Sequence, residues 1–302
     1  MKNGYRFWFL IGLIWMISTA CDRLWWHTHN GLPSWDQADY LNSALDHGRA
    51  LGLVQGGEWK GFKALLDLSP KIPPLASIFN GIIIALIGDE PSQAAWSLSF
   101  WNGLLLAGVA LWGIHLSGKR LALLGVVFVA IAPAFLELRT NYVLEMPLAA
   151  TVTLAMWQLS CWLGSRKEKV WRNTLLTAIA CSASILTKQS SLLVLLPALL
   201  WVTIATLKHE NNHRKIQLIT GFSLVIISII PWLKHNLITT LGGTNRAVIE
   251  SAAKEGEPSI FSLANWSWYI NILGEQLGSI MLVIGTSGCI LWAYFILKKK
   301  IK

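Results

Sequence analysis

Residues 93–137 read QAAWSLSFWNGLLLAGVALWGIHLSGKRLALLGVVFVAIAPAFLE, two long apolar runs separated by the basic pair Lys119-Arg120. The two runs have roughly the length, about 17 to 25 residues, that a helix needs to cross a membrane. Loops rich in lysine and arginine stay in the cytoplasm, so this pattern predicts a transmembrane hairpin with a cytoplasmic turn. The hairpin places the chain among helical integral membrane proteins.

The composition of the 302 residues indicates the same class. Hydrophobic residues make up 54% and charged residues 14%, whereas an ordinary soluble domain has about 25% charged residues. The 17 tryptophans suit the membrane–water interface. The net charge of +9 does not indicate nucleic-acid binding, because the basic residues are scattered among short loops. The four cysteines lack paired spacing and predict neither a disulfide framework nor a metal site.

Apolar runs elsewhere extend the pattern to eight predicted transmembrane helices, at residues 7–24, 93–116, 121–137, 146–164, 173–187, 190–207, 216–233 and 277–297. The first run has a basic start like a signal peptide, but we expect it to be retained as a membrane helix. The stretch 72–88 is also apolar, yet it opens with two prolines. We predict that 72–88 is an interfacial or re-entrant helix against the outer leaflet, because a crossing there would invert every later loop.

This threading separates the charges of the chain. Both termini and all the basic clusters then lie on the cytoplasmic side. These clusters are Lys119-Arg120, residues 166–172, Lys208 with Arg214-Lys215, and residues 298–300. Of the 16 acidic residues, only Glu168 and Glu210 then lie inside. The chain is therefore expected to be a single polytopic module, 1–302, in the cell (inner or plasma) membrane. Its outer loops are at about 25–92 and 234–276, and no separate soluble domain is predicted.

Five short motifs follow one another along the predicted outer face. They are Trp35-Asp36-Gln37-Ala38-Asp39-Tyr40, Lys71-Ile72-Pro73-Pro74-Leu75, Leu144-Glu145-Met146-Pro147-Leu148, Leu186-Thr187-Lys188 and Pro231-Trp232-Leu233-Lys234-His235-Asn236. This series resembles the GT-C membrane glycosyltransferases over essentially the whole chain. The most similar group is family 39 with its bacterial relatives, which include protein O-mannosyltransferases and the lipid A aminoarabinose transferase. The resemblance implies an all-α, GT-C-like helical bundle of about eight transmembrane helices, with interfacial helices in the first outer loop.

The resemblance also implies an inverting transferase that takes its sugar from a polyprenyl-phosphate-linked donor. The acceptor hydroxyl must lose a proton as it attacks, which requires a carboxylate base. Asp36 is the predicted base, and Glu145 is the second predicted catalytic residue, orienting the acceptor or helping to bind a divalent metal ion. Four features depart from the family pattern: Gln37 stands where the family usually has a second acid, Ile72 is inserted into the usual Lys-Pro-Pro, Glu145 stands where Asp is commoner, and His235 replaces an arginine. No metal site is assigned.

The departing lipid phosphate gains negative charge, so cationic side chains should contact it. Lys71 is the first candidate for binding the donor phosphate, followed by Lys188 and Arg246. Asp39, Tyr40 and His235 complete the predicted substrate-binding loops. Each lysine alone also fits a side chain that snorkels to the membrane interface, and Asp36 alone also fits a helix N-cap.

Two other functions remain open on the sequence. Relatives usually carry several more spans or a C-terminal domain, so the chain is also compatible with a non-catalytic or truncated membrane subunit. A lipid or solute transporter should have ionisable residues near the middle of its spans, or broken helices in matching halves. The predicted spans here are nearly free of charge, which favours the transferase. The donor sugar and the acceptor, whether protein, lipid or glycan, are not determined by the sequence.

Overall fold

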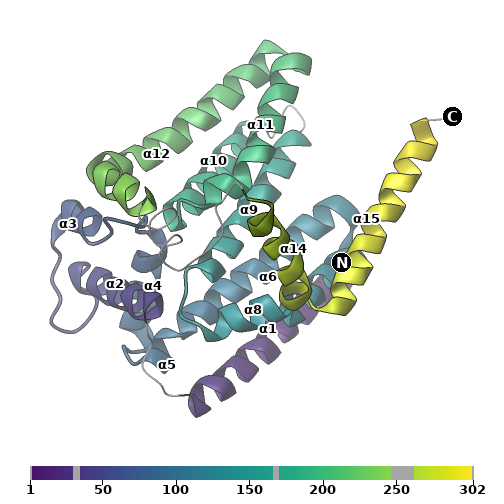
Figure 1. Cartoon of the computed structure of the whole chain (residues 1–302). Helices are drawn as coiled ribbons and strands as arrows, with labels where there is room; N and C mark the ends of the chain where they lie inside the picture. The colour runs from purple at the N-terminus through teal and green to yellow at the C-terminus, as the bar shows by residue number, and fades with distance from the viewer. Residues whose placement is uncertain (1, 30–34, 166–169, 246–261, 301–302) are drawn as a thin grey trace.

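The computed structural model describes residues 2–29, 35–165, 170–245 and 262–300, and within these ranges the chain forms helices and no β-strand. The helices are α1 (Lys2–Thr28), α2 (Asp36–Ala50), α3 (Gly61–Asp67), α4 (Leu75–Ile87), α5 (Pro91–Ala94), α6 (Trp96–Ser117), α7 (Lys119–Ile131), α8 (Pro133–Thr140), α9 (Glu145–Leu163), α10 (Val170–Thr187), α11 (Ser191–His209), α12 (Asn212–Asn245), α14 (Leu263–Leu277) and α15 (Ser279–Lys300). Figure 1 shows the short helices α2 to α5 gathered near the C-terminal ends of α1 and α12, with the α11–α12 turn at the opposite end of the bundle. The predicted all-α class is confirmed.

Five helices are long and apolar enough to cross a membrane, namely α1, α5 with α6, α9, α11 and α12. Two bent pairs raise the number to seven if each pair is one span: α7 with α8, and α14 with α15. The remaining predicted span corresponds to α10, which has 18 residues and packs between α9 and α12. This helix is less apolar than the five spans named above, because it contains polar residues such as Asn173, Thr174 and Ser182. These polar side chains are buried within the bundle.

Several boundaries differ from the predicted ones for identifiable reasons. The predicted span 121–137 is broken between α7 and α8 by a bend of 58°. Pro133 is the first residue of α8 and Ala132 before it is extended, as expected for a residue that precedes proline. At the other boundary, α12 continues to Asn245 through Pro231, so the predicted outer segment beginning at 234 starts as helix.

The apolar stretch after Lys71 forms α4, which has 13 residues. At 1.5 Å per residue it is about 20 Å long, against about 30 Å for the hydrocarbon core of a bilayer. Its length agrees with the prediction that 72–88 does not cross. One face of α4 packs closely on α2: a Cβ atom added to Gly81 would lie 2.5 Å from the carbonyl oxygen of Ala44. This glycine-mediated contact fixes α2, and with it Asp36, on the bundle.

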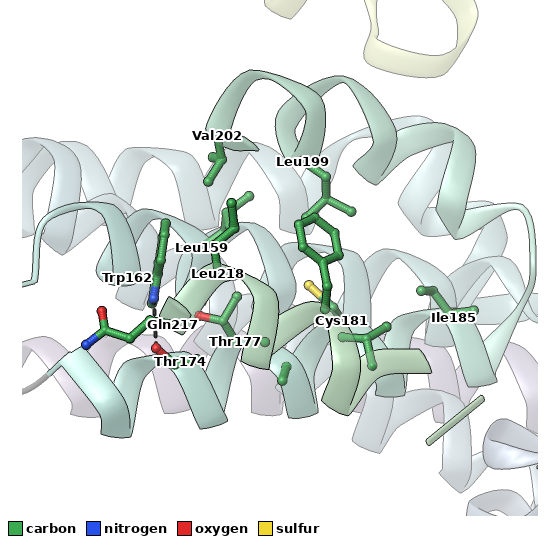
Figure 2. Close-up of a pocket in the computed structure, with 14 residues that line it drawn as sticks. Leu159, Trp162, Thr174, Thr177, Cys181, Ile185, Leu199, Val202, Gln217 and Leu218 are labelled. Atoms are coloured by element: carbon green, nitrogen blue, oxygen red, sulfur yellow. Dashed lines mark hydrogen bonds between the residues drawn. The ribbon is translucent and has the colours of Figure 1, made fainter. Parts of the chain in front are cut away.

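An apolar groove runs between α9, α10, α11 and α12 (Figure 2). Its walls include Leu159, Cys181, Leu199, Val202 and Phe222, and the indole of Trp162 donates a 2.9 Å hydrogen bond to the hydroxyl of Thr174 beside it. None of the predicted site residues lines this groove. The chemistry expected from the sequence therefore lies elsewhere.

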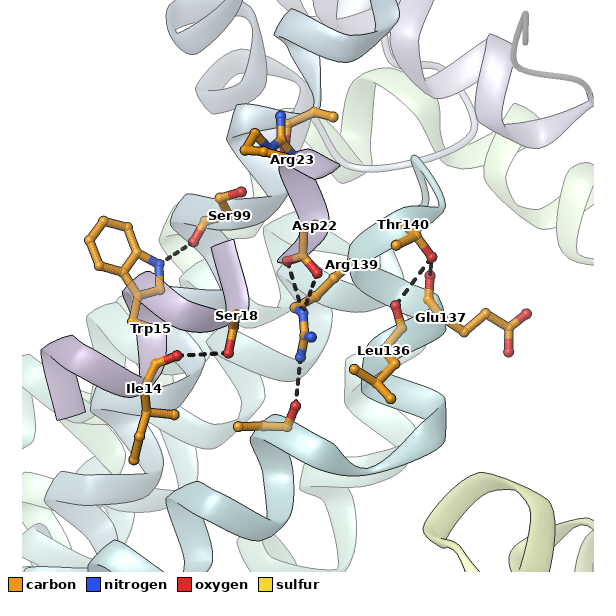
Figure 3. Close-up of polar contacts among 12 residues, drawn as sticks. Ile14, Trp15, Ser18, Asp22, Arg23, Ser99, Leu136, Glu137, Arg139 and Thr140 are labelled. Atoms are coloured by element: carbon orange, nitrogen blue, oxygen red, sulfur yellow. Dashed lines mark hydrogen bonds and ion pairs between the residues drawn. The ribbon is translucent and has the colours of Figure 1, made fainter. Parts of the chain in front are cut away.

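A buried ion pair joins α1 to α8 (Figure 3). The Nε atom of Arg139 donates to both carboxylate oxygens of Asp22 at 2.9 and 3.1 Å, and its Nη1 donates to the carbonyl of Ala130 at 2.8 Å. Both side chains are almost fully shielded, at 2% and 4% exposure. An ion pair in such a position is costly to desolvate and is retained only with good geometry. It therefore fixes how α8, and the chain leading into α9, sits on the first helix.

Candidate functional site

Asp36 is the first residue of α2, as the sequence predicted. Its carboxylate is exposed, and it forms no ion pair or hydrogen bond with the rest of the described chain. The residue before it, Trp35, has φ 50° and ψ −126° and exposes 92% of its surface. Such a backbone conformation costs about 1–3 kcal/mol in a residue other than glycine and is often found at functional sites. The N-cap of α2 is Trp35, which makes no side-chain capping hydrogen bond. Asp36 is therefore not the helix N-cap, which was the alternative to a catalytic role.

Tyr40 lies one turn after Asp36 on α2 and packs against the buried cluster that includes Met146 of α9. Burial raises the pKa of the Tyr40 hydroxyl, and the nearby carboxylates of Asp36, Glu145 and Asp39 raise it further. Negative charges act in this way only over short distances. The predicted catalytic carboxylates Asp36 and Glu145, 109 positions apart in the sequence, therefore both lie near one half-buried phenol.

Glu145 and Lys188 form an ion pair between the start of α9 and the turn after α10. The carboxylate of Glu145 remains 41% exposed, so it is still open to a ligand. As the first residue of α9, Glu145 also lies where the helix dipole favours a negative charge. Next to Lys188, the side-chain amide of Gln189 donates a 3.0 Å hydrogen bond to the carbonyl of Lys71. The backbone of Lys71 is thus held by the turn that carries Lys188.

Three predicted site residues remain: His235, Arg246 and Asp39. His235 on α12 lies 2.5 Å from the carboxylate of Asp67, the last residue of α3, and the neighbouring indole of Trp232 donates to the carbonyl of Ser69 at 2.8 Å. These contacts dock α12 against the segment that leads to Lys71. Arg246 lies outside the described residues, so its predicted role stays a prediction. Asp39 is exposed beside Tyr40.

The sequence left open whether a divalent metal ion binds beside Asp36 and Glu145. Within the described ranges, no group of three or more histidine, cysteine or acidic side chains is arranged to hold a metal ion. The carboxylate of Glu145 is paired with a lysine instead. The arrangement that the structure does provide is a group of carboxylates near Tyr40, of which Glu145 is paired with Lys188, and this suits proton transfer and the binding of an anion.

A buried histidine, His47, joins α2 to α3, and no sequence motif predicted this contact. The Nδ1 atom of His47 lies 2.6 Å from the carbonyl of Ser43, and its Nε2 lies 3.2 Å from both the Leu65 carbonyl and the Ser69 hydroxyl. A neutral ring can donate from Nδ1 to Ser43 and accept from Ser69 at Nε2. His47 therefore ties the helix carrying Asp36 to the segment carrying Lys71.

We expect this connection to weaken in acid. Burial lowers the pKa of His47, and the two carbonyl hydrogen bonds oppose that shift only in part. The unfolded chain then binds the proton more tightly, so stability is complete above the ordinary histidine pKa of about 6.5 and falls as the pH drops below it. Hydrogen exchange, corrected for intrinsic rates, should show less protection of α2 and α3 at about pH 5.5 than at about pH 7.5.

The change should depend on this one histidine. His47→Gln should remove the pH dependence of protection, whereas His209→Gln, at an exposed histidine at the end of α11, should retain it. Equal protection of α2 at the two pH values in the unmodified protein would show that His47 does not act in this way.

Comparison of the sequence with known protein families gives one match. The family model described as dolichyl-phosphate-mannose-protein mannosyltransferase matches residues 71–235, more than half of the chain. The matched region contains Lys71, Glu145, Lys188 and His235, and it begins after Asp36. No curated protein matches the chain.

Among solved structures, the crystal structure of ArnT from Cupriavidus metallidurans in the apo state is similar, with a TM-score of 0.54 and 18% sequence identity. The alignment covers 82% of this chain and 44% of ArnT, so the chain spans less than half the length of that protein. At this identity the similarity concerns the fold, and it confirms the GT-C-like architecture.

Proposed function

The chain belongs to the dolichyl-phosphate-mannose-protein mannosyltransferase family, and from that premise we propose that it transfers a sugar from a polyprenyl-phosphate-linked donor to an acceptor hydroxyl on the extracytoplasmic face of the inner membrane. The observation that carries the proposal is a chain of contacts: Asp36 and Glu145 both lie near Tyr40, and Glu145 pairs with Lys188. Gln189, the residue after Lys188, in turn holds the backbone of Lys71. These residues come from four separate parts of the chain. Their convergence supports a shared role in one reaction.

In the proposed reaction, the acceptor oxygen attacks the anomeric carbon from the side opposite the phosphate, which inverts the configuration. The bond between the anomeric carbon and the phosphate oxygen breaks as the new glycosidic bond forms. The hydroxyl proton passes to the carboxylate of Asp36, which is exposed and without a counter-ion among the described residues. The second carboxylate, Glu145, is held by Lys188 and is better suited to orient the acceptor than to take its proton.

The leaving polyprenyl phosphate carries away the bonding electron pair and needs a cation to stabilise it. The ammonium group of Lys71 is exposed and unpaired within the described chain, whereas Lys188 already has Glu145 as its partner. The backbone of Lys71 is fixed by Gln189, one residue after Lys188. Lys71 is therefore the better candidate for direct contact with the phosphate, and Lys188 acts through Glu145.

Radiolabelled polyprenyl-phosphate sugars in native membranes test this function. The unmodified chain should transfer label to membrane acceptors, and Lys71→Gln should lower kcat/KM for the donor by about 10- to 100-fold, the effect of losing one charged hydrogen bond worth about 1.5–3 kcal/mol. Lys60→Gln, at an exposed lysine just before α3, should transfer at the normal rate. If the unmodified chain transfers none of the labelled sugars, the proposed function is wrong.

A further inference from the structure

A second cleft lies near the C-terminal end of α1, where this helix meets α5 and the start of α6. Its volume is about 500 Å³, which falls within the range of about 300–1,000 Å³ typical of small-molecule sites. One wall comes from α1 and the residue after it, with Arg23, Trp26, His27 and His29. The other comes from residues Glu90–Gln93 and Trp96. None of the predicted catalytic residues lines this cleft.

The two walls are fastened together by Arg23. Its guanidinium donates to the carbonyls of Ser92 at 2.9 Å and Ala95 at 3.1 Å, and it lies over the indole of Trp96, 4.9 Å from the ring centroid. Trp96 nevertheless exposes 38% of its surface. The cleft thus has a rigid base with an accessible aromatic surface, which costs little conformational entropy on binding.

The polar groups of the cleft both donate and accept hydrogen bonds. His27 is exposed, and the ring of His29 is stacked on Trp25 with its Nδ1 bonded to the Trp25 carbonyl at 3.0 Å, which leaves Nε2 available. Glu90 opens α5 in a capping box with Gln93 and is exposed. With neutral histidines, the charge of Glu90 balances that of Arg23. The lining therefore suits an uncharged ligand rich in hydroxyl groups.

Two other ligand classes fit less well. A phosphate or other anion would meet Arg23 already engaged with two carbonyls and Glu90 with a negative charge. An extended peptide commonly binds by adding a strand to a sheet edge, and the described part of the chain forms no strand. A sugar ring matches the lining better, since its C–H face stacks on an aromatic ring and its hydroxyls both donate and accept hydrogen bonds.

The position of the cleft connects it with the candidate active site. Trp26, which lines the cleft and is 5% exposed, belongs to the same buried cluster as Leu41, Tyr142 and Met146. Tyr40 packs against this cluster, and Met146 directly follows Glu145 in the sequence. The cleft and the helix that carries Asp36 thus both adjoin this one buried cluster.

We propose that this cleft binds the acceptor and that the acceptor is a saccharide, so that the hydroxyl to be glycosylated belongs to a glycan. This inference rests on the proposed transferase function, because it assigns a substrate class to that reaction. The sugar ring would stack on the exposed indole of Trp96, with hydrogen bonds to the imidazole of His27 and the carboxylate of Glu90. The protein would then extend an existing glycan.

A binding experiment that requires no turnover tests the inference. The full chain in detergent is applied to an array that carries both bacterial-type glycans and serine- and threonine-containing peptides. Trp96→Ala and the milder His27→Ala remove cleft groups, whereas Trp171→Ala removes an exposed tryptophan at the start of α10 as a matched control. We expect glycan binding by the unmodified chain, at least a tenfold loss in both cleft variants, and unchanged binding by Trp171→Ala.

The outcomes separate the inference from the function on which it rests. Binding to peptides alone, no binding to any glycan, or glycan binding that survives both cleft variants would each overturn the saccharide assignment. Glycan binding that depends on Trp96 and His27, combined with no sugar transfer in membranes, would support the cleft while refuting the transferase proposal. Sugar transfer without glycan binding would support the transferase proposal and refute the saccharide assignment.

Discussion

Asp36→Asn should reduce sugar transfer by about 10²- to 10⁴-fold, the contribution typical of a general base. Asparagine retains the size of the side chain but cannot take up the proton of the acceptor hydroxyl. The carboxylate starts α2 and is exposed, so the substitution removes no packing and no ion pair in the described structure. Transfer from a labelled polyprenyl-phosphate sugar in native membranes measures the loss, and the amount of inserted protein should be unchanged.

The matched control is Asp46→Asn on the same helix. Asp46 is half exposed, and its ion pair with Arg49 is a surface contact at 3.3 Å. Such pairs contribute little to stability, about 0–1 kcal/mol, so this variant should transfer sugar at the normal rate. Full transfer by Asp36→Asn would assign the base to another residue, and equal losses in both variants would point to damage to α2 itself.

Arg139→Met should be the most destabilising single change, at about 3–5 kcal/mol, because it leaves the Asp22 carboxylate buried without its partner. The guanidinium also satisfies the carbonyl of Ala130, so that hydrogen bond is lost as well. Thermal unfolding of the purified protein in detergent micelles measures the effect. Arg120→Met, at an exposed arginine in the first turn of α7, should unfold at the normal temperature.

A double variant separates the charge of the pair from its place in the packing. Replacing both members of a buried ion pair by apolar residues of similar size is often neutral or stabilising. Asp22→Leu combined with Arg139→Met should therefore recover most of the stability that Arg139→Met loses. A double variant no more stable than the single one would show that the pair does not behave as a simple buried ion pair.

The sequence was most informative where a periodic or charge signal was strong. Long apolar runs between basic turns predicted the helical membrane class, and the two prolines before α4 with the charge pattern predicted that this segment does not cross. Asp36 at the start of α2, and Glu145 at the start of α9, were also placed correctly. Short motifs with fixed turn chemistry thus predicted the positions of the carboxylates.

Contacts between distant segments could not be predicted in this way. Nothing local to Asp22 or Arg139 indicates that they pair across 117 positions, and nothing near Asp67 indicates its contact with His235 on α12. The short helix α3 was missed because seven residues give too little periodicity to recognise. The partner of Lys188 was also missed, since pairing with Glu145 depends on how α9 and α10 pack.

The central claim is that Asp36 and Glu145 belong to one site on the outer side of the membrane. Cysteine accessibility in intact cells tests it, using single Asp36→Cys, Glu145→Cys and Arg120→Cys variants in a background without the four native cysteines, and a membrane-impermeant maleimide. Position 36, which is exposed, and position 145, whose side chain is 41% exposed, should react from outside. Position 120, at the start of α7, should react only after the membrane is permeabilised. Reaction of positions 36 and 145 from opposite sides of the membrane would contradict the account.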